Sequence, residues 1–130
     1  MLYDYDNRCP CGTGLLYGQC CYRYHDGNHN APTAEALMRS RFSAFAIGDT
    51  DYLLNTWDAD TRPAELNLDV GLEFYRLDIL STEGGGPFDT TGQVKFQAFY
   101  RGLADGLQEE NSTFRKIDGR WVYSVGEVAE

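Results

Sequence analysis

Four cysteines are the residues of this chain best suited to chemistry. Cys9, Cys11, Cys20 and Cys21 occur in the segment CPCGTGLLYGQCC, with one residue inside the first pair and eight residues between the pairs. Four thiolates from two short clusters can surround a tetrahedral Zn²⁺ at about 2.3 Å each. The spacing therefore predicts one zinc site. Because four protein ligands leave no open position for water, this site is expected to be structural rather than catalytic.

Other chemistries are open to these thiols. Two disulfides would need an oxidising compartment, and bridges within a Cys-X-Cys or a vicinal pair would be strained. A redox dithiol usually has the form Cys-X-X-Cys at the start of a helix, and that pattern is absent here. His25 and His29 could substitute for a cysteine ligand, but with four cysteines available we interpret both as exposed loop residues.

The residues around the cysteines favour the metal interpretation. Gly12, Gly14 and Gly18 allow the chain to return between the two pairs and allow backbone N–H groups to approach sulfur. Four thiolates over-neutralise a divalent cation, so the nearby Arg8 and Arg23 are expected to stabilise the anionic centre.

The chain divides into two parts that must position these residues. Residues 1–30 contain no apolar periodicity that could form a core, so this part needs a cross-link or a bound metal to hold it folded. Residues 31–130 show the apolar patterns of helices and strands. Apolar residues recur at helical spacing over 34–47, between a capping Thr33 and a terminating Gly48, and a second helix is expected over 51–57.

Extended segments rich in aromatic and branched residues follow these helices. Short connections join them, and Asp118 and Gly119 form a strong hairpin signal, so the segments are expected to pair as an antiparallel meander of four strands. The predicted fold class is α+β, with a curved sheet that wraps around a long helix and can leave a hollow between them. The four segments span residues 72–81, 93–100, 107–117 and 120–128.

The cysteine segment resembles the SEC-C zinc motif, first associated with the C-terminal tail of the bacterial preprotein translocase motor. The four ligand positions match the four cysteines, Thr13 stands where serine is usual, and Tyr17 fills the aromatic position. With YRYHDG, APTAEALMRSRFSAFAIGDTDYLLNTW, GQVKFQAFY, ENSTF and DGRWVYSVGEV, nearly the whole chain resembles the YchJ-like family of bacterial proteins. The resemblance implies a SEC-C motif over 1–30 and a nuclear-transport-factor-2-like (NTF2-like), cystatin-like cone over 31–130. It implies no established activity.

Two features depart from the relatives. Many SEC-C motifs carry lysines before the second cysteine pair, where this chain has Leu15, Leu16, Gly18 and Gln19, which does not favour docking onto an acidic protein or anionic lipid. Some relatives also have a second cysteine motif at the C-terminus, whereas this sequence ends in GEVAE.

Composition excludes several classes of partner. The formal net charge of -9 opposes binding to a phosphate backbone, so we expect no nucleic acid ligand. No cluster of basic residues suits a membrane surface, and no stretch approaches the roughly 20 apolar residues of a membrane helix. The N-terminus has no basic leader followed by an apolar run, so a cytoplasmic location is expected.

Two functions are compatible with this sequence. The first is a non-catalytic accessory protein whose zinc knuckle presents Leu15, Leu16 and Tyr17 to a protein partner. The same three residues could instead pack the knuckle onto the main domain. A free face of the sheet could also serve in a homodimer.

The second function is a small-molecule binder or an acid–base enzyme that uses the hollow of the cone. The main domain has no histidine, so general-base chemistry would fall to Asp78, Glu73 or Glu109. Asp78 is expected to point inward and to pair with Arg39 or Arg41. Most of the other residues that could line a pocket are aromatic, and aromatic residues at such spacings more often form a filled core than a ligand site. The candidate pocket residues are Arg39, Phe42, Trp57, Tyr75, Asp78, Phe96, Tyr100 and Trp121.

Overall fold

The computed structural model describes residues 4–68 and 71–128, so the outer ends of both predicted domains lie outside the described residues. Helices come first and four strands follow, which confirms the predicted order of elements and the α+β class. The elements are η1 (Tyr17–Gln19), α1 (Tyr22–His25), α2 (Ala34–Ile47), α3 (Thr50–Asn55), β1 (Leu72–Gly84), β2 (Thr91–Gly102), β3 (Gly106–Ile117) and β4 (Arg120–Val128).

The four strands form one antiparallel sheet in the order β1-β2-β3-β4, so each strand pairs with its neighbour in sequence. Asp118 and Gly119 join β3 to β4 with φ values of 52° and 79°, the left-handed geometry of a turn whose twist matches the sheet. The pairing register shifts at two places in β1, and at one place between β3 and β4, where Ser124 of β4 is the extra residue. Irregularities of this kind bend strands, so they account for the curvature of the sheet.

The long helix α2 forms where its sequence predicts it. The hydroxyl of Thr33 accepts a hydrogen bond from the N–H of Ala36 at 3.0 Å, and Gly48 ends the helix with a φ of 84°. One side of α2 packs against the concave face of the sheet and builds the main core. The buried core residues are Ala31, Ala34, Leu37, Met38, Phe42, Leu77, Val94, Phe96, Ala98, Phe114 and Trp121.

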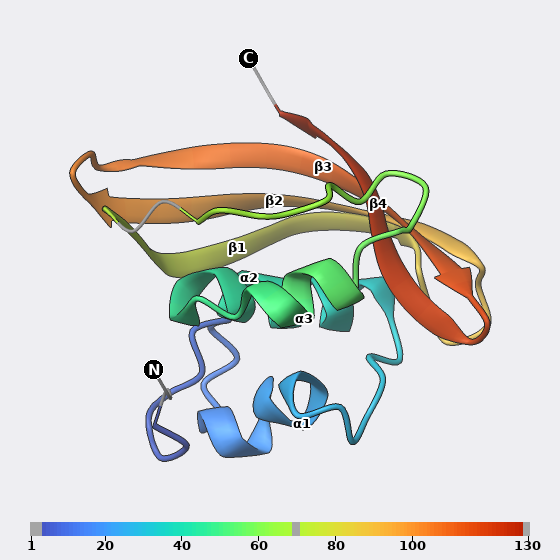
Figure 1. Cartoon of the computed structure of the whole chain (residues 1–130), viewed down its shortest axis with the longest axis horizontal. Helices are drawn as coiled ribbons and strands as arrows, with labels where there is room; N and C mark the ends of the chain where they lie inside the picture. The colour runs from blue at the N-terminus through green and yellow to red at the C-terminus, as the bar shows by residue number, and fades with distance from the viewer. Residues whose placement is uncertain (1–3, 69–70, 129–130) are drawn as a thin grey trace.

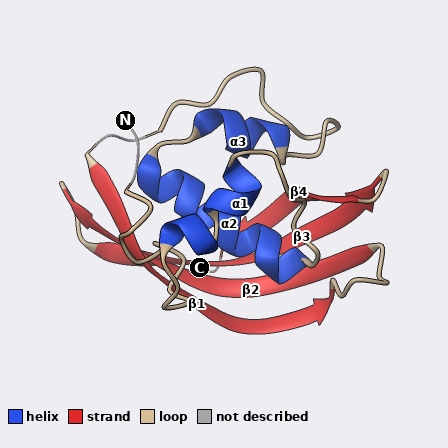
Figure 2. Cartoon of the chain, turned by 90° about the horizontal axis from the view of Figure 1, so that it is seen from below, coloured by secondary structure: helices blue, strands red, loops and turns tan. Residues whose placement is uncertain are grey.

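The molecule is arranged in three tiers, which Figures 1 and 2 show from two sides. The curved sheet is the first tier, α2 and α3 lie along its concave side, and the N-terminal segment with α1 lies on the far side of the helices. The sheet therefore wraps around the helices as predicted. The opposite side of α2 receives the cysteine segment, which forms a separate buried cluster with Ile47 packed against it.

Candidate metal centre and cone cavity

The four cysteine sulfur atoms all lie within 4.8 Å of one another, and all four residues are buried. The Sγ of Cys20 is 3.6 Å from that of Cys11 and 4.0 Å from that of Cys21. Ligands about 2.3 Å from a tetrahedral zinc ion would stand about 3.8 Å apart. No histidine or carboxylate among the described residues joins this group. The cluster therefore fits a metal ion held by four thiolates.

The local backbone brings the two cysteine pairs together. The N–H of Cys9 donates to the carbonyl oxygen of Leu15 at 2.8 Å, which closes a hairpin between the pairs. Gly12 and Gly14, with φ values of 86° and 87°, allow the tight return of the chain. The vicinal pair lies at the junction of η1 and α1, where the chain changes direction. Both pairs thus face the same point.

Two hydroxyl groups flank the cysteine cluster. The Oγ1 of Thr13 lies 3.2 Å from the Sγ of Cys20 and 3.7 Å from that of Cys11. From the other side, the Oγ of Ser43 in α2 lies 3.3 Å from the Sγ of Cys21 and 3.4 Å from that of Cys9. Each sulfur therefore has a hydroxyl neighbour. Because a hydroxyl has one proton, Thr13 can donate to Cys20 and Ser43, which belongs to the main domain, donates to Cys21.

Crowding of the sulfur atoms perturbs their protonation. Hydrogen bonds from Cys11 and Cys21 hold the pKa of Cys9 far below its usual range, and hydrogen bonds led by that from Cys21 lower the pKa of Cys20 to about 6. Cys21 has a raised pKa because its hydrogen bonds to the other cysteines favour the protonated form. Two thiols of the cluster thus have lowered pKa values and two, Cys11 and Cys21, have raised ones, and a divalent cation would displace the protons that remain.

Arginines donate hydrogen bonds to the backbone of the cysteine segment. Arg23 donates from Nε to the carbonyl oxygen of Cys20 at 3.1 Å, and Arg39 of α2 donates from Nη1 to that of Cys11 at 2.9 Å. Arg8 donates to the carbonyl oxygen of Gly14, in the return between the pairs. The sequence indicated Arg8 and Arg23, but not the contact of Arg39 with this segment.

His25 is not the exposed loop residue that we expected. It ends α1, its Nδ1 is 2.6 Å from the hydroxyl of Tyr17, and its Nε2 is 2.8 Å from the carbonyl oxygen of Ser40 in α2. A carbonyl can only accept, so Nε2 carries the proton and Nδ1 accepts from Tyr17. Burial lowers the pKa of His25, which favours this neutral form. His29 is exposed.

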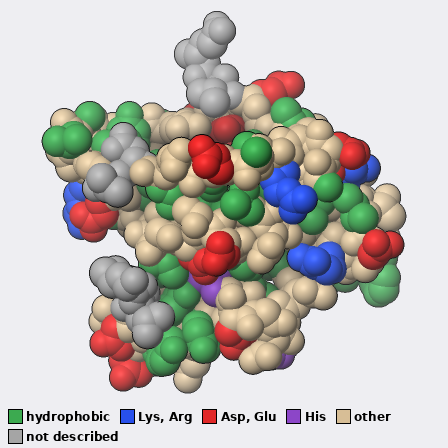
Figure 3. All heavy atoms as spheres, in the orientation of Figure 1, with side chains coloured by type: hydrophobic (Ala, Val, Ile, Leu, Met, Phe, Trp, Pro, Cys, Tyr) green, Lys and Arg blue, Asp and Glu red, His purple; other side chains and the backbone are tan. Residues whose placement is uncertain are grey.

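The three residues predicted as a partner surface have different environments. Leu15 is 49% exposed and Leu16 is half-buried, whereas Tyr17 is 3% exposed and packs with the cysteines. The expectation that Tyr17 forms part of an exposed patch is therefore wrong. Tyr5 is a further large apolar residue exposed on this segment. Figure 3 shows hydrophobic side chains gathered on the N-terminal part of the molecule, with acidic side chains beside them.

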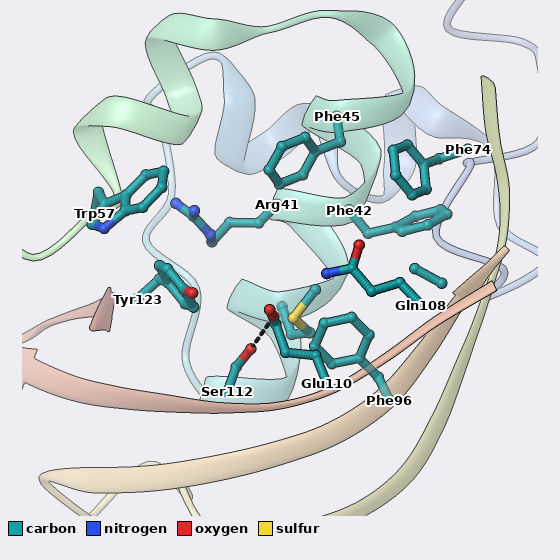
Figure 4. A pocket seen from close by; sticks show the side chains of 12 residues that line it. Arg41, Phe42, Phe45, Trp57, Phe74, Phe96, Gln108, Glu110, Ser112 and Tyr123 are labelled. Carbon is teal, nitrogen blue, oxygen red and sulfur yellow. Dashed lines mark hydrogen bonds between the residues drawn. The ribbon is translucent and has the colours of Figure 1, made fainter. Parts of the chain in front are cut away.

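A cavity of about 290 Å³ lies between α2 and the concave face of the sheet. Three of the predicted pocket residues line it, namely Phe42, Trp57 and Phe96. The other walls include Phe45 and Phe74, so the cavity is largely apolar. Figure 4 shows that polar side chains also enter it, from α2 and from the neighbouring strands.

The other predicted pocket residues lie outside this cavity. Arg39 contacts the cysteine segment and Glu35, and Tyr75 is exposed beneath the guanidinium of Arg101. The ring of Tyr100 packs edge-on against that of Phe74. Trp121 donates from Nε1 to the carbonyl oxygen of Pro32 and lines a different cavity, between α1 and α3.

The expectation that Asp78 points inward and pairs with Arg39 or Arg41 is wrong. Its carboxylate accepts two hydrogen bonds of 3.0 Å from Arg76, two residues away on the same strand, in an exposed pair. The two other carboxylates considered as bases are also paired, Glu73 with Arg101 and Glu109 with Gln97. None of these three carboxylates lines the cone cavity.

Sequence reasoning missed the polar groups that do line the cavity. Gln108, Glu110 and Ser112 alternate along β3 on the face that also carries the buried Phe114. Because side chains of a strand alternate between faces, that phenylalanine was the signal that could have found them. Arg41 of α2 also lines the cavity, although the sequence suggested it only as a partner for Asp78.

Comparison with known families matches the two parts of the chain separately. Residues 33–126 match the family model described as the YchJ middle NTF2-like domain, and residues 7–23 match the SEC-C motif. A UPF0225 protein of Corynebacterium efficiens is 81% identical over the full length of both chains. A UPF0225 protein of Streptomyces coelicolor is 54% identical over 94% of this chain and 96% of its own.

Two solved structures resemble this one. A SEC-C motif containing protein from Rhodopseudomonas palustris superposes with a TM-score of 0.81 at 35% identity, over 95% of this chain and 100% of its own. A SEC-C motif containing protein from Psychrobacter arcticus gives a TM-score of 0.74 at 27% identity, over 97% of this chain and 85% of its own. Among the described residues, no helix is both long and apolar enough to cross a bilayer.

Proposed function

This chain belongs to the YchJ family of UPF0225 proteins, and we propose that it is a zinc-binding accessory protein whose SEC-C segment is a structural knuckle presenting a surface to a protein partner. The observation that carries the proposal is the group of four buried sulfur atoms within 4.8 Å of one another. A tetrahedral set of four sulfur ligands selects zinc or iron. Zinc is the metal of the SEC-C motifs that the sequence resembles.

The surroundings of the sulfur atoms support a structural role. Four thiolates fill a tetrahedral zinc ion, so a fifth ligand such as water has no position from which to react. A centre of this kind carries a net charge of about −2, since each thiolate contributes −1 and the metal +2. The hydroxyls of Thr13 and Ser43 can donate to that charge, and Arg23 and Arg39 lie against the ligand backbone.

The metal would hold the segment in the shape that presents Leu15. This leucine follows the hairpin return between the two cysteine pairs, and its backbone carbonyl is bound by the N–H of Cys9. Its side chain is 49% exposed, and Leu16 beside it is half-buried. An apolar side chain fixed on a rigid turn loses little conformational entropy on binding, which suits it to contact another protein.

The partner surface can be tested by affinity purification from cells of the native host or a close relative. The double variant Leu15→Ala with Leu16→Ala should lose proteins that the unaltered chain retains. Leu103→Ala is a matched control, because Leu103 is 87% exposed in the turn between β2 and β3, outside the cysteine segment. Cys11→Ser should lose the same proteins as the double variant, since Cys11 is fully buried in the cluster.

Retention of the same proteins by the unaltered chain and by both knuckle variants would contradict the proposed surface. Loss of the same proteins by Leu103→Ala would also contradict the proposed surface, because replacement of any exposed leucine would then have the same effect. Metal content measured on each purified variant separates the two parts of the proposal. The leucine variants should keep their metal, and Cys11→Ser should not.

A further inference from the structure

The cone cavity combines an apolar wall with one strongly polar side. Rings from α2 and the sheet form the wall, and the volume of about 290 Å³ is close to the lower end of the range of about 300–1,000 Å³ for ligand pockets. The polar side is formed by Arg41 together with side chains from β3 and β4. A filled core would carry no such groups, so the polar side needs an explanation.

Arg41 is a buried cation without a direct ion pair among the described residues, although the charge of Glu110 acts on it from a longer distance. Only 3% of the residue is exposed, and none of the described carboxylates lies within 4.0 Å of its guanidinium. Its flanking groups are the faces of two rings, with centroids 4.6 Å away for Tyr123 and 5.1 Å for Trp57. Arg115, by contrast, binds two aspartates although it is far more exposed. A buried charge is costly unless it is paired.

The structural contacts of Arg41 use only one of its nitrogens. Nη1 donates at 2.8 Å to both the carbonyl oxygen of Leu53 and the hydroxyl of Thr56, which tie α2 to the end of α3. Nε and Nη2 make no hydrogen bond with any residue that the structure describes. Burial lowers the pKa of Arg41 to about 10, so the side chain remains a cation at neutral pH. Two nitrogens of a charged fork, with three N–H donors between them, are therefore uncommitted.

The strand residues of this polar side present acceptors and further donors. The carboxylate of Glu110 binds only the hydroxyl of Ser112, at 2.8 Å, among the described residues. The amide of Gln108 and the hydroxyl of Tyr123 line the cavity without a hydrogen bond to any described side chain or backbone group. Figure 4 shows these groups converging on the space between Arg41 and β3.

We propose that the cone cavity binds a small organic carboxylate with an apolar body and a hydrogen-bond donor. The carboxylate would take the free donors of Arg41, whose planar fork suits that geometry. The apolar body would lie against the phenylalanine rings, and the donor would face Glu110. This site is separate from the cysteine cluster, so its occupancy does not depend on the metal proposed above.

The proposal can be tested on the unaltered protein with three probes of similar shape. They are 3-phenylpropionate, its neutral counterpart 3-phenylpropanamide, and L-phenylalanine, which adds an ammonium group. Binding is followed by chemical-shift changes in the NMR spectrum of the labelled protein. The carboxylate should bind about tenfold or more tightly than the amide, because a hydrogen bond to a charged group contributes more than a neutral one. L-phenylalanine should bind more tightly still.

Variants assign these preferences to residues. Arg41→Gln should remove the preference for the carboxylate over the amide. Arg101→Gln should keep it, because Arg101 also lies 4.6 Å from a tyrosine ring but is exposed and paired with Glu73. Glu110→Gln should remove the advantage of L-phenylalanine. Arg41→Gln could fail to fold, but the comparison of probes on the unaltered protein does not depend on it.

The outcomes separate clearly. Shifts confined to cavity residues, with the predicted order of affinity, would support the proposal. Equal binding of the carboxylate and the amide, or no change at the cavity residues, would overturn it. A carboxylate preference without any advantage for L-phenylalanine would overturn the role given to Glu110.

Discussion

The hydroxyl of Ser43, in the C-terminal half of α2, lies 3.3 Å from the sulfur of Cys21. The same oxygen is 3.4 Å from the sulfur of Cys9, so one residue of the main domain touches both cysteine pairs. Ser43 is fully buried. The cysteine segment is therefore attached to the cone at the cysteines that are proposed as metal ligands. Groups that bind metal ligands tune the affinity of a site, which makes this contact a sensitive place to test the account.

Ser43→Ala should weaken zinc binding by about tenfold to a hundredfold, the usual cost of losing a partner of a metal ligand. The substitution removes the hydroxyl beside two sulfur atoms and leaves α2 otherwise intact. Competition with a chromophoric chelator measures the affinity. Ser40→Ala is the matched control, because Ser40 is equally buried on α2 but its hydroxyl binds Tyr52. Equal effects of both substitutions would contradict a specific role for Ser43.

Removal of the metal should unfold residues 1–30 and leave the sheet folded. The cysteine cluster is separate from the main core, and it is the only cluster of buried apolar residues formed by the described part of the segment, residues 4–30. The metal-binding energy should therefore be its folding energy. After chelation, NMR signals of the cysteine segment should move to random-coil positions, with smaller changes near Arg39 and Ser43. Loss of all dispersed signals in one step would contradict this division.

Asp58 should make the protein sensitive to acid. Its buried carboxylate accepts hydrogen bonds from Arg115 and Ser124, and the bond with Arg115 holds the pKa of Asp58 well below its usual range. A depressed pKa stabilises the fold above the unfolded value of about 3.9, and that stability is lost as the pH falls through the folded value. Thermal unfolding of Asp58→Asn should accordingly give a lower Tm than the unaltered chain at pH 7, and the difference should shrink below about pH 4.

Asp78→Asn provides the control for that experiment. Asp78 also pairs with an arginine through two hydrogen bonds, but the pair is exposed and links residues of one strand. Exposed pairs of this kind contribute little to stability. The Tm of this variant should stay close to that of the unaltered chain at both pH values. A similar pH dependence for the two variants would refute the special role of Asp58.

Phe114→Ala should lower the free energy of unfolding by about 3–5 kcal/mol, the usual cost of truncating a buried phenylalanine. The side chain is fully buried in the main core and contacts the ring of Tyr123 edge-on. Phe88→Ala should have almost no effect, since Phe88 is 99% exposed. Chemical denaturation measures both values. If Phe114→Ala lowered the free energy of unfolding only slightly, Phe114 would not be a central residue of the main core.

Local patterns in the sequence were sufficient for most of the fold. The helix over Ala34–Ile47 has its cap, apolar period and glycine stop within one continuous stretch, and Asp118 and Gly119 fix their hairpin without help from distant residues. The cysteine spacing is equally local. Each of these features depends on neighbours in the chain, so each could be predicted from sequence.

Contacts between distant elements could not be predicted in the same way. Asp78 was expected to reach the helix, but Arg76 on its own strand satisfies it. Tyr17 was expected at the surface, but His25 and the cysteines enclose it. Arg41 lies in the cavity because the chain just after α3 places Trp57 beside it and β4 places Tyr123 there. The rotation of a helix against a sheet decides such pairings, and no local pattern specifies that rotation.

X-ray absorption at the zinc edge, on protein purified without added metal, tests the central claim most directly. We predict one zinc ion per chain with four sulfur neighbours at about 2.3 Å and no oxygen or nitrogen ligand, because Cys9, Cys11, Cys20 and Cys21 fill the tetrahedron. Iron in place of zinc, a coordination shell that includes a light atom, or metal-free protein with two disulfides would contradict the account.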